Sequence, residues 1–184
     1  MYKIVFVYGS LMGGFANHRI ISNSKFWFLG HYKVKGTLYS IADIYPALTL
    51  GTSNNIIEGQ LFLIDQPTWE KICQLEGSLY KSQPLHLDPD TMTTCIEKIN
   101  QTVGNLNIVR NNLVMYFEAT PNLIKNRKPI RFNSWYNYKK IINPYRITNN
   151  SVLKTVQEIW YRTVGSDLKS AHPSFYKEVK KKFN

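Results

Sequence analysis

The alternation of apolar and polar positions predicts mainly short strands between residues 1 and 120. Residues 3–8 and 57–64 are runs of apolar, β-branched and aromatic side chains that end at turn or cap residues, a pattern typical of strands. Gly36 indicates a bulge or a close backbone approach within a further such stretch. Many short strands with few helices predict an α+β fold with a mixed, barrel-like sheet rather than a doubly wound one. The remaining strand-like stretches are 26–29, 33–41, 45–50, 83–88, 93–99 and 113–119.

Cap residues mark the predicted helices of the same region. Asp65 precedes a proline, Pro67, at an early helix position, and this pair predicts a helix over 68–75 that stops at Glu76. Asn17 is a candidate cap for a short helix that follows it. The apolar face of the longer helix consists of Trp69, Ile72 and Cys73.

The charge divides the chain into two parts. The 184 residues carry a formal net charge of +11, from 23 Lys and Arg against 12 Asp and Glu. Residues 1–120 contain nine basic and nine acidic side chains, whereas residues 121–184 contain fourteen basic and three acidic ones. We therefore expect a neutral core domain over 1–120 and a basic, aromatic-rich, mainly helical extension over 121–184, packed on the core or following it. Caps at Ser134, at Asn150 or Ser151, and at Ser174 predict its helices, the first over 135–142.

Composition excludes several classes of protein. With 43% hydrophobic and 14% aromatic residues the chain is too apolar to be disordered. No run approaches the roughly 18 to 20 apolar residues that a membrane helix needs, and the first residues resemble no secretory signal. Two cysteines are too few for a disulfide scaffold or a four-ligand zinc site. We expect a cytoplasmic protein with no membrane partner and no metal site.

Four segments, in this order and spacing, resemble the gamma-glutamylcyclotransferase-like superfamily. They are Val7–Leu11 with Asn17-His18-Arg19 downstream, Tyr45–Leu48, Glu58–Asp65, and Leu75–Tyr80. The opening V-Y-G-[ST]-L followed by N-H-R is most similar to the gamma-glutamylamine cyclotransferase branch. Val114–Tyr116 and then Trp135-x-x-Tyr138 are similar to the last strand of the family and the motif that often follows it. The resemblance covers roughly residues 3–140 and implies a small mixed β-barrel with flanking helices.

The resemblance also implies a reaction. Enzymes of this kind cleave a γ-glutamyl amide or amine by intramolecular attack of the substrate's α-amine on its γ-carbonyl, which gives 5-oxoproline and a free amine. No metal or cofactor is required. The protein must fold the γ-glutamyl arm into a reactive shape. It must also hold the α-carboxylate and the developing oxyanion, and supply one acid/base group.

Glu76 matches the acid/base of the family. It ends the predicted helix and precedes a glycine, so its carboxyl could be held in a pocket where partial burial raises its pKa. The residues alone also allow a surface glutamate at a helix C-terminus, where the helix dipole does not help it.

Five further residues are implied as substrate-binding. Tyr8, Gly9, Ser10 and Leu11 match the substrate loop, where consecutive N–H groups can cradle a carboxylate; a plain strand-to-loop turn is the alternative. Tyr80 matches a tyrosine after the glutamate, although its spacing of four residues is shorter than in the family.

Several other residues carry chemistry without a clear pattern. Tyr138 is a sixth candidate for substrate binding; its hydroxyl either reaches the site or its ring simply packs. His18 and Arg19 are better explained as the start of a helix beside the loop. Cys73 is better explained as part of the core, and the pair Asp88 and Asp90 as a solvated turn.

The basic extension keeps other functions open. Basic residues interleaved with aromatic ones are what a nucleic-acid surface uses, so a non-catalytic member of the fold that binds a nucleotide, RNA or another polyanion is the alternative function. The preferred interpretation of the extension itself is a helical cap whose aromatic residues pack on the barrel and whose lysines stay in water. The cap could also steer or select an anionic substrate. A third possibility is an enzyme of the same fold with an unusual substrate, such as a modified nucleotide or an antibiotic side chain.

Overall fold

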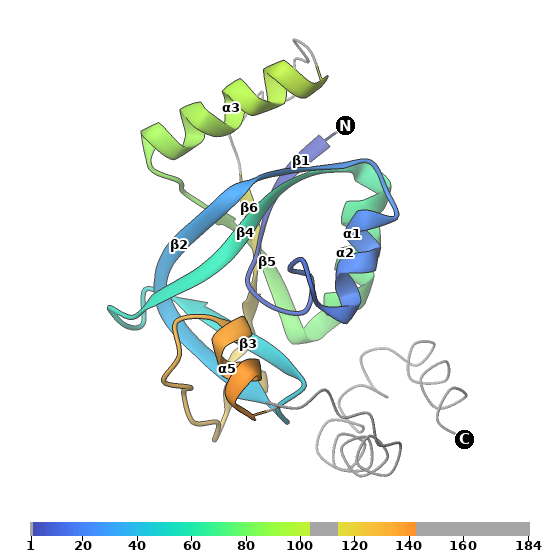
Figure 1. Cartoon of the computed structure of the whole chain (residues 1–184). Coiled ribbons are helices and arrows are strands. Elements are labelled where there is room, and N and C mark those ends of the chain that lie inside the picture. The colour runs from blue at the N-terminus through green and yellow to red at the C-terminus, as the bar shows by residue number, and fades with distance from the viewer. Residues whose placement is uncertain (1, 104–113, 143–184) are drawn as a thin grey trace, which may run out of the picture.

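The computed structural model describes residues 2–103 and 114–142, which form one curled sheet with helices around it (Figure 1). The sheet has six strands in the order β3-β2-β4-β1-β6-β5. The strands are β1 (Tyr2–Val7), β2 (Phe26–Ile41), β3 (Tyr45–Leu50), β4 (Ile56–Asp65), β5 (Tyr80–Leu85) and β6 (Val114–Ala119).

The sheet is mixed because one of its pairings is parallel. β1 runs parallel to β6, with Ile4 opposite Val114. It runs antiparallel to β4, with Tyr2 opposite Asp65, and the other neighbouring pairs are antiparallel as well. β1 therefore lies at the centre of the sheet, and its end at Val7 opens directly into the predicted substrate loop.

The sheet curls far enough to bring two of its distant strands together. The N–H of Leu50 in β3 donates a hydrogen bond of 3.2 Å to Glu118 Oε1 in β6, although three strands separate β3 from β6 in the sheet order. At Gly36 an added Cβ would lie 2.5 Å from the carbonyl oxygen of Thr49, so this glycine allows a close backbone approach. The bulge lies elsewhere in β2, between Phe28 and Gly30. These contacts confirm the expected mixed, barrel-like sheet.

The helices lie at the ends and on the outside of the curl (Figure 1). A 3-10 turn, η1 (Ala16–His18), leads into α1 (Arg19–Ser22), and α2 (Gln66–Glu76) leads into a second 3-10 turn, η2 (Gly77–Leu79). The remaining helices are α3 (Pro89–Val103), α4 (Pro121–Ile124) and α5 (Trp135–Ile142). None of the helices in the described ranges is long and apolar enough to cross a membrane.

The caps predicted for α2 and α5 are present. Asp65 Oδ1 accepts from the N–H of Thr68 at 3.0 Å, and Ser134 Oγ accepts from the N–H of Asn137 at 3.1 Å. Each bond satisfies a backbone donor that the first turn of a helix leaves without a partner. The helices expected after Asn150 and Ser174 lie outside the described residues.

The strand predicted over 93–99 is wrong, because this segment lies inside α3. Asp88, expected in a solvated turn, accepts from the N–H of Thr91 at 2.9 Å and caps the helix. The Thr93 and Thr94 hydroxyls donate to carbonyls four residues earlier, so β-branched residues are satisfied within the helix. The stretches 26–29 and 33–41 form the single strand β2, and the segment 83–88 overlaps β5, which begins earlier at Tyr80.

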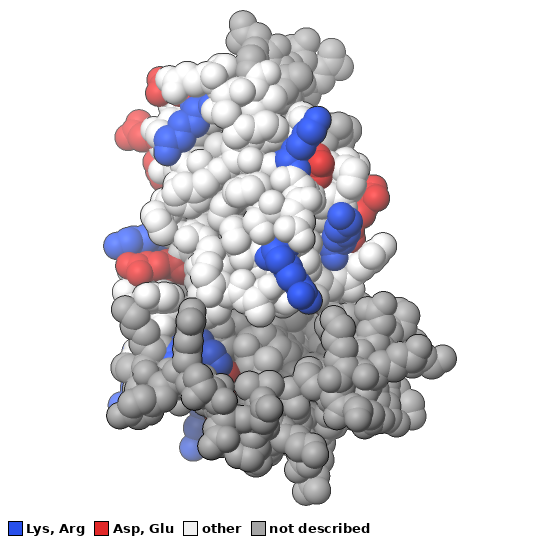
Figure 2. Space-filling view, turned by 45° about the vertical axis from the view of Figure 1, so that its right-hand side comes forward, with Lys and Arg blue, Asp and Glu red and all other residues white. Residues whose placement is uncertain are grey.

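The core lies inside the curl and extends beyond residue 120. Trp135 of α5 is fully buried, as are Phe6 in β1 and Ile72 in α2. On the face drawn in Figure 2, basic and acidic side chains of the described residues are scattered over a mostly neutral surface, and several lie beside a side chain of opposite charge.

Candidate active site

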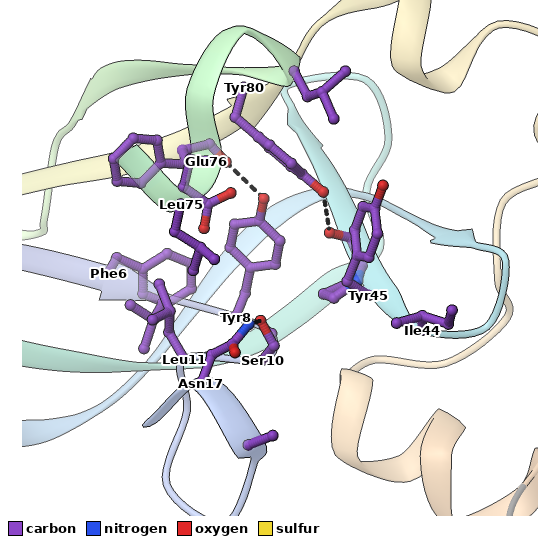
Figure 3. Close-up of a pocket in the computed structure, with 16 residues that line it drawn as sticks. Phe6, Tyr8, Ser10, Leu11, Asn17, Ile44, Tyr45, Leu75, Glu76 and Tyr80 are labelled. Carbon is purple, nitrogen blue, oxygen red and sulfur yellow. Dashed lines mark hydrogen bonds between the residues drawn. The ribbon is translucent and has the colours of Figure 1, made fainter. Parts of the chain in front are cut away.

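A cavity of about 270 Å³ opens at the end of the curled sheet, where β1, α2 and the β2–β3 hairpin meet (Figure 3). It brings together all the predicted site residues except Tyr138. The residues that line it are Phe6, Val7, Tyr8, Gly9, Ser10, Leu11, Ala16, Asn17, Ile44, Tyr45, Pro46, Leu75, Glu76, Leu79, Tyr80 and Phe117. Most of these side chains are apolar, and Glu76 is the charged one among them.

Glu76 is placed by the end of α2. The helix stops there because Gly77 takes φ 50°, a left-handed value that favours glycine, and donates its N–H to the carbonyl of Cys73. Burial raises the pKa of the Glu76 carboxyl from 4.5 to about 8, because transfer from water penalises the charged form. The carboxyl faces Tyr8 in Figure 3. At neutral pH the carboxyl is thus mostly protonated, with a smaller fraction present as the carboxylate.

Two buried tyrosines hold the walls of the cavity. The Tyr8 hydroxyl donates to the carbonyl of Phe117 at 2.7 Å, and the Tyr80 hydroxyl donates to the carbonyl of Pro46 at 2.8 Å. Burial, together with the nearby Glu76 carboxyl, raises the pKa of each phenol well above its ordinary value. Both phenols therefore stay protonated. The Tyr80 hydroxyl does reach the cavity despite its short spacing from Glu76.

The loop after β1 is tightly packed against the hairpin. An added Cβ at Gly9 would lie 2.3 Å from Cγ of Pro46, so close contact requires glycine at this position. The carbonyl of Gly9 accepts from the N–H of Met12 at 2.9 Å, which closes a turn around Ser10 and Leu11. The structure thus places the Tyr8–Leu11 loop against the Tyr45–Leu48 motif.

Tyr138 is not among the residues that line the cavity. Its hydroxyl donates to Asp43 Oδ1, and its ring packs against Trp135 with centroids 5.2 Å apart. The next residue, Lys139, donates from Nζ to the carbonyl of Asp43 at 2.8 Å. Ser40 Oγ also donates to Asp43 Oδ1, at 2.7 Å. We call these four residues, Ser40, Asp43, Tyr138 and Lys139, the Asp43 cluster.

Sequence reasoning missed several residues of the cavity. Asn17, expected as a helix cap, instead donates from Nδ2 to Ser10 Oγ at 3.0 Å. Its place in the Asn17-His18-Arg19 motif was the signal that could have revealed it. Tyr45, Pro46, Leu75 and Leu79 lie within quoted motif segments but were not proposed as site residues. Ile44 and Phe117 lie outside those segments, so no motif indicated them.

The other candidates lie outside the cavity lining. His18 Nδ1 is 2.9 Å from the carbonyl oxygen of Leu11, and the His18 ring packs against Phe26 and Phe62. Cys73 is a half-buried free thiol on α2. In the described ranges, no group of three or more His, Cys, Asp or Glu residues is arranged to hold a metal ion.

The fold is shared by solved structures of other proteins. A uropathogenic Escherichia coli-specific protein superposes with a TM-score of 0.56 at 14% identity, over 76% of this chain and 96% of that one. The described part is therefore a known type of small mixed barrel, with the cavity and its buried carboxyl at one end.

The sequence then identifies the family. The family model for gamma-glutamyl cyclotransferase, AIG2-like, matches residues 5–112, and the chain belongs to this family. That range contains each of the residues that line the cavity except Phe117.

Two curated relatives share this region. A protein of Methanocaldococcus jannaschii named "Putative gamma-glutamylcyclotransferase" is 39% identical over 76 residues, which are 41% of this chain and 62% of that protein. A Vibrio cholerae protein of the same name is 31% identical over 96 residues, 51% of this chain and 75% of its own length. This chain thus matches less than two thirds of the archaeal relative.

Proposed function

We propose that the protein is a cyclotransferase that cleaves a γ-glutamyl amine to 5-oxoproline and a free amine. The observation that carries this proposal is the Glu76 carboxyl, which is the charged side chain among the described residues that line the cavity and whose pKa is raised to about 8. A group with such a pKa can both accept and return a proton near neutral pH. The family and the names of the two curated relatives support the same reaction class.

In the proposed reaction Glu76 moves protons from the attacking nitrogen to the leaving nitrogen. As a carboxylate it takes a proton from the substrate's α-ammonium, and the freed amine attacks the γ-carbonyl carbon. A C–N bond forms within the substrate and the C–N bond to the leaving amine breaks. Glu76 gives that proton to the leaving nitrogen. As a carboxylate again, it takes the second proton from the ring nitrogen and passes it to the freed amine, which leaves as an ammonium ion. Atoms and charge therefore balance, and Glu76 ends as the carboxylate it was. The Tyr8–Leu11 loop and Tyr80 bind the γ-glutamyl head.

The charge of the cavity favours an amine over an amino acid as leaving group. A γ-glutamyl amino acid carries a second carboxylate beside the scissile bond. Within the described residues no Lys or Arg side chain lines the cavity to meet it, and the charge at Glu76 would repel it. A leaving amine with no carboxylate beside the scissile bond, such as the ε-amine of lysine, avoids both costs, which supports the gamma-glutamylamine cyclotransferase branch.

The test is a substrate panel with product detection. Purified protein is incubated with γ-glutamyl-ε-lysine, γ-glutamyl amino acids and glutathione, and 5-oxoproline is measured by mass spectrometry. We expect product chiefly from γ-glutamyl-ε-lysine, and a loss of about 100-fold or more in kcat for Glu76→Gln, the size of effect typical of a general acid/base. The matched control is Glu70→Gln, an exposed residue of the same helix, which should retain activity. A folded wild type that gives no 5-oxoproline from any compound would refute the proposal.

A further inference from the structure

Within the described part of the chain, no cationic side chain lines the cavity to help it bind an anion. A γ-glutamyl substrate carries an α-carboxylate, yet Glu76, itself a carboxyl, is the charged side chain among the residues that line the cavity. The hydroxyls of Tyr8 and Tyr80 already donate to backbone carbonyls. The carboxylate therefore has to be held by other neutral donors, and such bonds to a charged acceptor are among the stronger ones in proteins.

Ser10 lies in the cavity lining with its hydroxyl oriented by a neighbour. Asn17 Nδ2 donates to Ser10 Oγ at 3.0 Å, and Figure 3 shows this pair on the wall of the cavity near Tyr8. An amide NH₂ can only donate, so it occupies a lone pair of the serine oxygen. The Ser10 O–H remains free to donate. The hydrogen bond that Ser10 Oγ accepts from Asn17 strengthens the one that its O–H donates.

We propose that Asn17 is a positioning residue that makes the Ser10 hydroxyl a hydrogen-bond donor to the α-carboxylate of the substrate. This inference rests on the proposed function, because it assumes a γ-glutamyl substrate in the cavity. Asn17 acts only through Ser10, which touches the substrate.

The segment that carries Asn17 is itself fastened to the loop. His18 Nδ1 lies 2.9 Å from the carbonyl oxygen of Leu11; because a carbonyl only accepts, Nδ1 carries the hydrogen. On the other side of the loop, Gln60 Oε1 accepts from the N–H of Gly13 at 2.8 Å. Consecutive residues of η1 therefore contact consecutive residues of the loop, and Ser10 is held before any substrate arrives, which lowers the cost of binding.

The test compares Ser10→Ala, Asn17→Ala and Asn17→Asp on γ-glutamyl-ε-lysine. We expect KM to rise about 10-fold or more for Ser10→Ala, the factor that loss of one hydrogen bond to a charged group produces, and less for Asn17→Ala. Asn17→Asp should raise KM most. Its carboxylate accepts the hydrogen bond of the Ser10 O–H, which is then no longer available to the substrate, and its charge repels the substrate's α-carboxylate. kcat should change little. Asn23→Ala is the matched control, since Asn23 is exposed at the end of α1 and belongs to no cavity wall.

Two further measurements separate positioning from a structural effect. The double variant Ser10→Ala/Asn17→Ala should have the KM of Ser10→Ala alone, because in this proposal Asn17 acts through the Ser10 hydroxyl. With the substrate's α-carboxylate replaced by a carboxamide, the difference between wild type and Asn17→Asp should shrink. Additive effects, or equal effects on both substrates, would overturn the inference while the proposed function stands. A wild type that neither turns over nor binds γ-glutamyl-ε-lysine in calorimetry would overturn both.

Discussion

At the scale of the residue, ionisation of Glu76 works against folding. Burial raises the pKa of its carboxyl to about 8 in the folded chain, against 4.5 ordinarily. Between these two pH values the folded state binds more protons than the unfolded state, so the free energy of unfolding falls as pH rises. The stability that the protonated Glu76 carboxyl gives the folded state is fully present below about pH 4.5. It is lost as the pH rises through about 8.

We therefore expect the stability advantage of Glu76→Gln over the wild type to grow with pH. The glutamine does not ionise, so the difference in unfolding free energy should increase between pH 5 and pH 8.5, by an amount on the order of a few kcal/mol. Urea unfolding of both proteins at several pH values measures it. Glu70→Gln, at an exposed position, should show a constant difference. A constant difference for Glu76→Gln as well would mean that its carboxyl titrates as in water.

At the scale of the element, the Asp43 cluster joins α5 to the β2–β3 hairpin. Ala42 and Asp43 take φ values of 50° and 57°, a left-handed turn that non-glycine residues adopt at a cost. The contacts from Ser40, Tyr138 and Lys139 converge on Asp43 and offset that cost. The residues that follow directly, Ile44 to Pro46, line the cavity, so α5 fixes one of its walls.

We expect Tyr138→Phe to destabilise the protein by about 1 kcal/mol, the typical net value of one partly exposed hydrogen bond. KM for the γ-glutamyl substrate should rise, because the β2–β3 hairpin that forms one wall of the cavity is held less firmly. kcat should be nearly unchanged. Thermal unfolding and steady-state kinetics measure the two effects. Tyr39→Phe is the control, because no hydrogen bond of its hydroxyl is found among the described residues. A large loss of kcat with unchanged stability would instead favour direct contact between Tyr138 and the substrate.

Local chemistry explains which elements could be predicted from the sequence. The cap and proline before α2 correctly predicted that helix, and hence the position of Glu76 at its end. The same signal, Asp88-Pro89, precedes α3, although a strand was expected over 93–99. Cys95 and Ile99 are buried four residues apart on that helix, and their burial against the sheet outweighs the weak intrinsic preference of threonine for strands.

Contacts between distant segments explain what the sequence could not reveal of the site. The motifs correctly indicated Glu76, Tyr80 and the Tyr8–Leu11 loop as neighbours. They did not indicate Phe117, which reaches the cavity only because β6 pairs parallel to β1. The role of Gly9 likewise depends on Pro46, which lies far along the chain. Such contacts are set by the closure of the sheet, which no local pattern records.

At the scale of the whole molecule, the core does not end at residue 120, where the charge changes. The N–H of Ile130 donates to the carbonyl of Leu38 at 2.9 Å, and the N–H of Glu58 donates to the carbonyl of Asn133 at 2.7 Å. Leu123 is buried and Trp135 is fully so. Residues 121–142 are thus part of the folded unit, and six of the fourteen basic residues of the extension belong to them.

We expect a chain that ends at residue 142 to fold cooperatively, and one that ends at residue 120 not to fold. Removing the side chain of a single buried tryptophan costs about 3 to 5 kcal/mol, and small domains have only about 5 to 15 kcal/mol in total. The shorter chain also loses Leu123 and leaves the backbone partners of Ile130 and Asn133 unpaired. Near-ultraviolet circular dichroism and thermal unfolding distinguish the two chains. If the chain ending at residue 120 unfolds at the same temperature as the longer one, the segment around Trp135 is an appendage and the charge boundary is also the boundary of the domain.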